Sequence, residues 1–132
     1  MLRLALARSS RRLRQQAGHE LSPSRAAVLA TIAREGPISP SALASLERVS
    51  RPTVTRLVEK LTAAGLVDCT PDPADGRSYL ISLSESGSAL RELRHARKNA
   101  YLAKLIASAS PGELDVLERA AVLLLRLIEE DE

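Results

Sequence analysis

Two short helical segments separated only by residues 47–49 constrain the fold of this chain most. The first segment starts at Ser39-Pro40 and the second at Ser50, and serine is a preferred helix N-cap. Apolar residues recur at helical spacing in both segments. Gly65 stands where the second helix would end in a left-handed conformation. Two short helices joined by so tight a turn predict a helix-turn-helix.

The segment that follows changes from helical to β-type spacing. Apolar residues at 66–69 precede a tip rich in Pro, Asp and Gly at 70–77, and an apolar run with β-forming residues resumes at 79–83. This pattern predicts a β-hairpin. A hairpin directly after a helix-turn-helix is a wing. We therefore expect a winged helix-turn-helix core over residues 20–83.

Four more helices are expected around these elements. Helical spacing runs from 2 to 17 before Gly18, and again from the N-cap Ser22 to Gly36-Pro37. Ser84 is placed to cap a long helix, and Ser110 begins the last one with capping-box spacing to Glu113. The expected fold class is mainly α with a small β-hairpin, in which a helical dimerisation region accompanies the winged core.

The terminal helices carry more apolar surface than one helix can cover. A chain of 132 residues builds only one modest core, and with 2% aromatic residues that core is aliphatic. We therefore expect a two-fold homodimer formed by residues 1–19 and 84–132. The alternative is that these helices pack only within one subunit. The residues expected at the dimer interface are Leu2, Leu6, Leu114, Leu117, Ala121, Leu124 and Ile128.

The distribution of charge and the lack of catalytic motifs limit the classes of function that this chain can have. The formal net charge is only +3, but arginine is clustered at 3–14, 48–56 and 91–97. No phosphate-binding glycine loop, HExxH, CxxC or nucleophile elbow is present, so we expect no enzyme, cofactor or metal. One cysteine and the lack of about 20 consecutive apolar residues predict a soluble, cytoplasmic protein without membrane attachment.

The start of the second short helix is the first candidate DNA-binding surface. In a helix-turn-helix this end enters the major groove. Arg can bridge two guanine acceptors, while Thr can bond a base and pack on a thymine methyl. The N-cap and the free backbone amides of the first turn suit a phosphate. The alternative is a solvated polar face. The residues expected to contact DNA here are Ser50, Arg51, Pro52, Thr53, Thr55 and Arg56.

The hairpin tip is the second candidate. Asp75 and Arg77 flank Gly76, so on an extended strand their side chains would share one side and pair. A guanidinium held there could enter the minor groove. The alternative is an ordinary hairpin.

With these motifs the chain resembles the MarR family of bacterial regulators. The resemblance rests on residues 49–58, 61–67, 72–77 and 83–87 and runs over nearly the whole length. It implies a homodimer that binds a pseudo-palindromic DNA duplex and represses by blocking RNA polymerase, with Arg56 reading bases and Arg77 in the minor groove. It also implies, as in many relatives, release of DNA when a small aromatic or phenolic compound binds between the DNA-binding and dimerisation regions.

Several residues allow two interpretations. Tyr101 either lines an effector site or is core, and we favour core because it lies on an apolar helix face. For Cys69 we favour a packed thiol over a redox sensor, and for His19 and His95 ordinary positions over metal ligands. A solvated face is favoured for the N-terminal arginines. For the whole chain, the alternative function is a winged-helix protein-interaction module without specific DNA binding.

Overall fold

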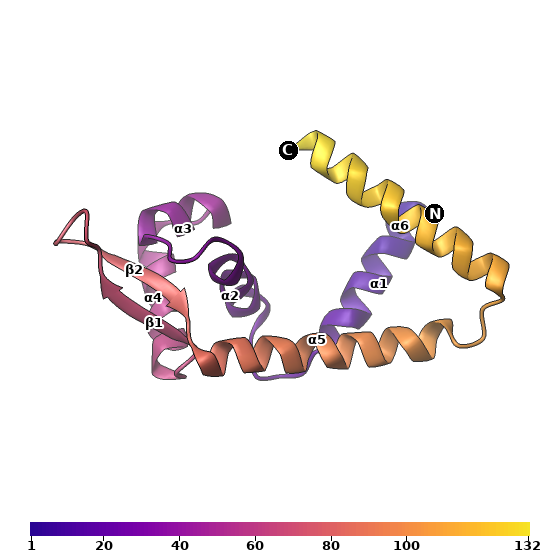
Figure 1. The fold of residues 1–132 in the computed structure, drawn as a ribbon, viewed down its shortest axis with the longest axis horizontal. Helices are drawn as coiled ribbons and strands as arrows, with labels where there is room; N and C mark the ends of the chain where they lie inside the picture. The colour runs from indigo at the N-terminus through magenta and orange to yellow at the C-terminus, as the bar shows by residue number, and fades with distance from the viewer. The chain divides into compact units, whose positions relative to one another are not determined.

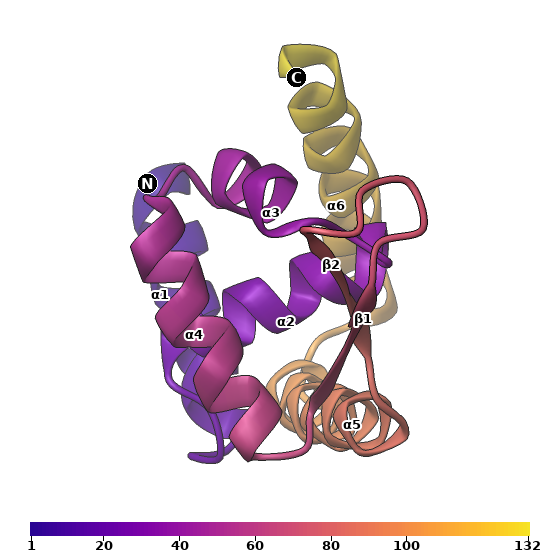
Figure 2. The same ribbon diagram turned by 90° about the vertical axis from the view of Figure 1, so that its left-hand side faces the viewer.

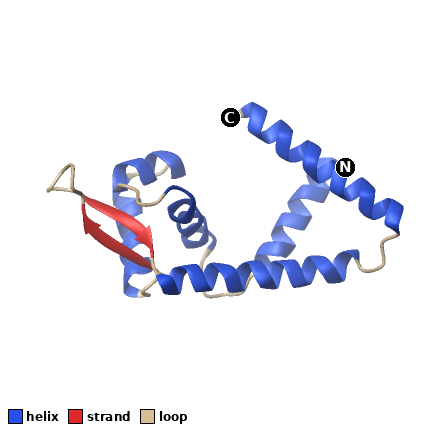
Figure 3. Cartoon of the chain, viewed as in Figure 1, coloured by secondary structure: helices blue, strands red, loops and turns tan.

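The computed structural model describes residues 1–132 and contains six helices and a two-stranded antiparallel sheet (Figures 1 and 3). The chain divides into two compact units, Met1–Lys98 and Asn99–Glu132. The predicted fold class, mainly α with one hairpin in a winged helix-turn-helix, is confirmed. The elements in order are α1 (Leu2–Gln16), α2 (Pro23–Glu35), α3 (Pro40–Glu47), α4 (Arg51–Ala63), β1 (Val67–Pro71), β2 (Tyr79–Leu83), α5 (Glu85–Ile106) and α6 (Pro111–Asp131).

The helices begin where their N-cap serines are. The hydroxyl of Ser22 accepts a hydrogen bond from the backbone N–H of Arg25, and Ser39 and Ser50 do the same for the residues three positions on. Ser110 forms the complete predicted capping box with Glu113. Each cap satisfies an N–H group that has no partner within the helix, and it contributes about 1 kcal/mol.

The core of the first unit lies between α2, α3, α4 and the hairpin. Figure 2 shows α2 in the centre of these elements. Fully burying one such aliphatic side chain contributes about 1.5–3 kcal/mol, so this cluster is the main source of stability for the unit. The largest completely buried side chains include Leu29, Ile32, Leu43, Leu61 and Ile81.

The tight turn between α3 and α4 depends on a residue that is not glycine. Arg48 adopts a left-handed conformation with φ of 55° at the end of α3. This conformation reverses the chain within a few residues, which brings Ser50 to the start of α4. At the same end of α3, the carboxylate of Glu47 accepts a hydrogen bond from the buried hydroxyl of Thr31 on α2. The turn is therefore anchored to the central helix.

A third short strand-like segment, absent from the sequence prediction, extends the hairpin. Ile38 donates its backbone N–H to the carbonyl of Ile81 at 3.0 Å and accepts one from the N–H of Ile81 at 2.8 Å. Ile38 and Ile81 are both buried. The base of the wing is thus tied to the segment before α3.

Ser84 joins three elements where β2 meets α5. Its hydroxyl donates to the carbonyl of Gly65 at 2.6 Å and accepts from the N–H of Gly87 at 3.0 Å, which confirms it as the N-cap of α5. Gly65 follows α4 with φ of 73°, as the left-handed closing residue that the sequence predicted. The C-terminal end of α4, the base of the wing and the start of α5 therefore meet at one buried hydroxyl.

The variant Gly87→Ala is expected to destabilise this junction. A Cβ at position 87 would lie 2.1 Å from the carbonyl oxygen of Leu66, and backbone cannot move aside cheaply. Overpacking of this kind costs about 1–3 kcal/mol or more. Chemical denaturation followed by circular dichroism measures the loss. The control is Gly112→Ala, whose Cβ would meet only the Ser110 hydroxyl at 4.0 Å. Equal stability of the two variants would contradict the packing described here.

In the second unit, the apolar residues of α6 are exposed except Leu124, which is half-buried. No residue of α6 is buried. No helix of the structure combines the length and the apolar character that a membrane crossing requires.

Candidate nucleic-acid interface

The buried face of α4 determines which side chains its other face presents. Val54, Val58 and Leu61 are buried against the core. Pro52 lies in the first turn, where the missing N–H costs no hydrogen bond and its fixed φ suits the helix. Ser50, Arg51 and Arg56 are consequently exposed.

The polar groups of the first turn of α4 are ordered by short-range hydrogen bonds. The hydroxyls of Ser50 and Thr53 lie 2.9 Å apart, and the Thr55 hydroxyl donates to the carbonyl of Arg51 at 3.0 Å. The guanidinium of Arg51 donates to the hydroxyl of Ser41 on α3. Arg56 makes no such contact within the chain and is exposed, so its guanidinium is free to reach outward. This surface of α4 therefore combines hydroxyl groups that are fixed by hydrogen bonds with the unpaired guanidinium of Arg56.

The electrostatics of this end of α4 favour an anion. The first turn contains no acidic residue, and Arg48 and Arg51 flank the N-cap. Backbone N–H groups without helical partners add a partial positive charge there. A phosphate group would meet donors and cations from both sides of the turn.

The wing differs from the sequence prediction in how Asp75 acts. Asp75 and Arg77 were expected to pair as side chains on an extended strand. Instead, the tip is a turn between β1 and β2, and Oδ1 of Asp75 accepts the backbone N–H of Arg77 at 3.0 Å. In a turn, an Asp carboxylate commonly accepts a hydrogen bond from the backbone N–H two residues further along the chain, because that N–H is held close to it by the backbone. Asp75 therefore shapes the loop, and Arg77 is exposed in it.

Cys69 is exposed, and the prediction of a packed thiol was wrong. Val67 and Cys69 both lie on β1, yet only Val67 is buried, even though Ile81, the partner of Cys69 across the hairpin, is completely buried. The sulfur lies 3.9 Å from the Thr62 hydroxyl. Tyr79, opposite Pro71 on the hairpin, is half-buried, and burial raises the pKa of its phenol.

The residues expected at the dimer interface leave apolar surface uncovered in the single chain. Ala121 is exposed and Leu124 is half-buried. Leu2, Leu6, Leu114, Leu117 and Ile128 are exposed by between 37% and 61%. Two of these residues belong to the first compact unit and the other five to the second.

The remaining residues that the sequence singled out have no shared site. Tyr101 is half-buried, and its hydroxyl is shielded from solvent without a hydrogen-bond partner. His19 and His95 are exposed. Partial burial of the His95 imidazole, and then the positive charges of Arg91, Lys98 and Arg94, lower the pKa of His95. No group of three or more His, Cys, Asp or Glu side chains is arranged to hold a metal ion.

Sequence reasoning missed a cavity of about 510 Å³ between α1, the segment before α2, α2 and α5. Its basic lining residues are Arg11, Arg14, His19, Arg94 and Lys98. The arginine clusters at 3–14 and 91–97 were the available signal, but their meeting in space was not visible in the sequence.

The sequence is similar to those of known transcriptional regulators. The sequence profile of the MarR family matches residues 21–79. An uncharacterized HTH-type transcriptional regulator of Mycobacterium bovis is 41% identical, over 98% of this chain and 91% of its own. The HTH-type transcriptional repressor NicR of Pseudomonas putida is 33% identical, over 100% of this chain and 82% of its own.

Solved structures of other proteins have the same fold as this chain. A MarR family protein from Bacillus stearothermophilus superposes with a TM-score of 0.80 at 25% identity, covering 97% of this chain and 90% of that one. A MepR mutant of Staphylococcus aureus bound to an oligodeoxyribonucleotide has the same fold, with a TM-score of 0.73 at 18% identity over 97% of this chain and 98% of that one.

Proposed function

Because the chain belongs to the MarR family of transcriptional regulators, we propose that it is a homodimeric repressor of a pseudo-palindromic DNA operator. The N-terminal half of α4 carries this proposal, since it combines the hydroxyls and free amides of the first turn with the unpaired and exposed Arg56. In this proposal α4 enters the major groove, where Arg56 and the Thr53 and Thr55 side chains contact base edges. The repressor role is proposed because NicR, which is 33% identical to this chain, is a transcriptional repressor.

Each contact has a physical role in the proposal. Ser50 and the amides of the first turn bind a phosphate, which positions the helix without reading sequence. Arg51, tied to Ser41, adds a cation on the α3 side. Pro52 keeps the first turn helical. The wing, shaped by Asp75, places Arg77 in the neighbouring minor groove.

Dimerisation would supply a second DNA-binding helix. A two-fold dimer places two copies of α4 on half-sites about one helical turn apart. The exposed apolar residues of α1 and α6 would form the shared interface, since an isolated chain leaves them in water. We therefore assign residues 20–83 to DNA reading, and residues 1–19 and 84–132 to dimerisation. The protein would act in the cytoplasm, with access to the chromosome, and a small-molecule effector would release it from DNA.

Selection from a pool of random DNA duplexes tests this proposal. Enrichment of an inverted repeat with half-sites about one helical turn apart is the expected result. If the pool yields no common sequence and binding is weak and strongly salt-sensitive, the protein does not read DNA, and the winged-helix protein-interaction module becomes the better interpretation.

The variant Arg77→Ala is expected to weaken operator binding by about 1–3 kcal/mol at fixed salt, because an arginine in a narrow minor groove meets strong negative potential. Fluorescence anisotropy with a labelled operator measures the change. Arg34→Ala is the matched control, because it removes the same charge from an exposed position at the end of α2. Equal affinities for Arg77→Ala and the unaltered protein would refute the wing contact.

A further inference from the structure

Helix α1 is attached to the rest of its compact unit mainly where it ends. None of its residues is buried, and none forms a hydrogen bond or an ion pair with another element. The first completely buried residue is Ala17, the C-cap of α1. The direction in which α1 leaves the unit therefore depends on the connection between α1 and α2, residues 17–22.

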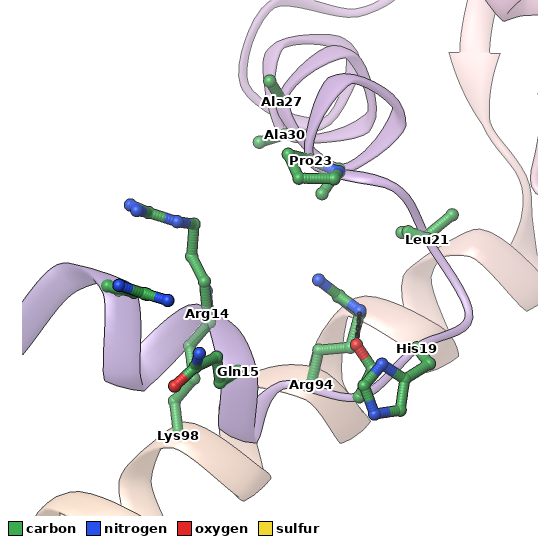
Figure 4. Close-up of a pocket in the computed structure, with 12 residues that line it drawn as sticks. Arg14, Gln15, His19, Leu21, Pro23, Ala27, Ala30, Arg94 and Lys98 are labelled. Atoms are coloured by element: carbon green, nitrogen blue, oxygen red, sulfur yellow. Dashed lines mark hydrogen bonds between the residues drawn. The ribbon is translucent and has the colours of Figure 1, made fainter.

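Two arginines of α5 hold this connection. Nη1 of Arg97 donates a hydrogen bond to the carbonyl of Ala17 at 2.9 Å, and Nη1 of Arg94 donates one to the carbonyl of Gly18 at 3.3 Å. Carbonyls at a helix C-terminus lack partners within the helix, so these bonds satisfy acceptors at the end of α1. Figure 4 shows Arg94 pointing from α5 to the chain beside His19. The two arginines are three positions apart and therefore lie on one face of α5.

Glu20 joins the two arginines into one network. Its Oε1 accepts a hydrogen bond of 2.6 Å from Arg97, and its Oε2 lies 3.8 Å from Nη1 of Arg94. The hydrogen bond from Arg97 is the main cause of the lowered pKa of Glu20, so the carboxylate is charged at neutral pH. Because Arg94 is buried, Glu20 supplies the counter-ion of a cation that is shielded from water. We call Glu20, Arg94 and Arg97 the Glu20 clamp.

Gly18 fits the clamp because it has no side chain. Its φ is 110°, a conformation that glycine adopts without strain. A Cβ at this position would lie 2.1 Å from Nη1 of Arg97 and 2.3 Å from Oε2 of Glu20. Any other residue would push the two charged groups away from the backbone. The close approach of the clamp to the chain therefore requires glycine.

One helix holds both the clamp and the proposed DNA-binding elements. Helix α5 runs without interruption from Glu85 to Ile106. At its start, the hydroxyl of Ser84 donates to the carbonyl of Gly65, which follows α4. The two clamp arginines lie about three turns further along the helix. Because a helix is stiff over this length, the clamp fixes α1 relative to α4.

We infer that the Glu20 clamp sets the spacing between half-sites that the dimer accepts, by fixing the direction in which α1 leaves α5. This positioning role rests on the proposed function, a dimer that reads two half-sites through α4 and associates through α1 and α6. One added base pair moves a half-site by about 3.4 Å and rotates it by about 35°. Two copies of α4 on a rigid frame therefore fit one spacing, whereas a loosened frame follows the displaced half-site.

Operators with altered spacing test this inference. The unaltered protein should bind about tenfold or more weakly when one base pair is inserted or removed between the half-sites of the selected operator. Glu20→Gln and Arg97→Gln should each reduce this penalty to about threefold or less. Affinity for a duplex with a single half-site should not change, because α4 and the wing are intact. Fluorescence anisotropy measures all of these affinities.

Two results would overturn the inference. The first is a spacing penalty in both variants equal to that of the unaltered protein. The second is a loss of single half-site affinity in both variants, which would show that the clamp maintains the α4 surface itself rather than its position in the dimer.

Matched variants separate the clamp from a change of charge. Glu20→Gln raises the formal charge and Arg97→Gln lowers it, so a loss of spacing preference shared by both cannot come from charge. Gly18→Ala displaces the clamp without removing any charged group, and it should behave like these two variants. The control is Glu35→Gln, which removes a carboxylate from the exposed ion pair with Arg34 and should retain the full spacing penalty.

A measurement without DNA tests the rigidity of the frame directly. Cys69 is the only cysteine of the chain and is exposed, so one spin label can be attached to each wing. Pulsed electron paramagnetic resonance then measures the distance between the two labels of a homodimer. The distance distribution should be narrow for the unaltered protein and for Glu35→Gln, and broader for Glu20→Gln and Arg97→Gln.

The outcomes distinguish the clamp from the proposed function. Distributions of equal width in a homodimer would overturn the inference and leave the dimer standing. The absence of any distance between labels would show a monomer, which refutes the proposed dimer and the clamp's role with it. Failure of the duplex selection concerns DNA binding alone and leaves the distance measurement valid.

Discussion

The double variant L117E/L124E is expected to be monomeric and to lose about a hundredfold or more in operator affinity. Leu117 is 52% exposed in the single chain and Leu124 is half-buried, so in the proposed dimer both would be covered by the partner. A glutamate in such an interface would be buried without a partner, which costs several kcal/mol. With the two readers separated, each half-site is bound independently and the gain from linkage is lost.

Light scattering measures the mass, and anisotropy with the selected operator measures the affinity. The control is R119A/R126A on the same helix. It changes the formal charge by the same amount and removes only exposed ion pairs with Asp115 and Glu130, which contribute little. A monomeric unaltered protein, or a dimeric L117E/L124E variant, would refute the proposed interface.

The variant Arg56→Ala is expected to abolish preference for the base pair that Arg56 reads and to cost about 1–3 kcal/mol on the selected operator. Arg56 is exposed and unpaired on α4, so its removal disturbs no contact within the protein. The effect should be much smaller on a duplex in which that base pair is changed, because the lost contact was specific to it. Arg56→Lys should retain charge but lose the paired hydrogen bonds to guanine.

Anisotropy at one fixed salt concentration, with the operator and its single-base variants, measures this preference. Lys60→Ala is the matched control, since Lys60 is an exposed cation in the last turn of the same helix. An unchanged specificity profile for Arg56→Ala would show that α4 does not read bases through this residue.

Features that depend on near neighbours in the chain were predictable. The serine N-caps, the capping box of α6 and the left-handed Gly65 each involve hydrogen bonds or conformations within a few residues. The short spacing from α3 to α4 likewise left little room for anything but a tight turn. Local steric and hydrogen-bonding preferences are strong enough to decide such features.

Two errors arose where a local pattern was extended too far. Cys69 was expected to be packed because it lies on a strand of the wing, but its thiol is exposed although Ile81, its partner across the hairpin, is completely buried. The spacing of Asp75 and Arg77 suggested a side-chain pair on an extended strand. The actual turn brings the backbone N–H of Arg77 closer to the carboxylate than the guanidinium.

The sequence by itself determined that two short helices, a tight turn and a wing would follow one another, because each depends on residues close together in the chain. Only the tertiary structure decided what flanks that motif. Ile38 joins the hairpin, Ser84 joins α4 to α5, and Arg94 reaches the carbonyl of Gly18 from 76 positions away. Such contacts depend on how whole helices pack, and packing follows from the summed burial of many side chains rather than from any local pattern.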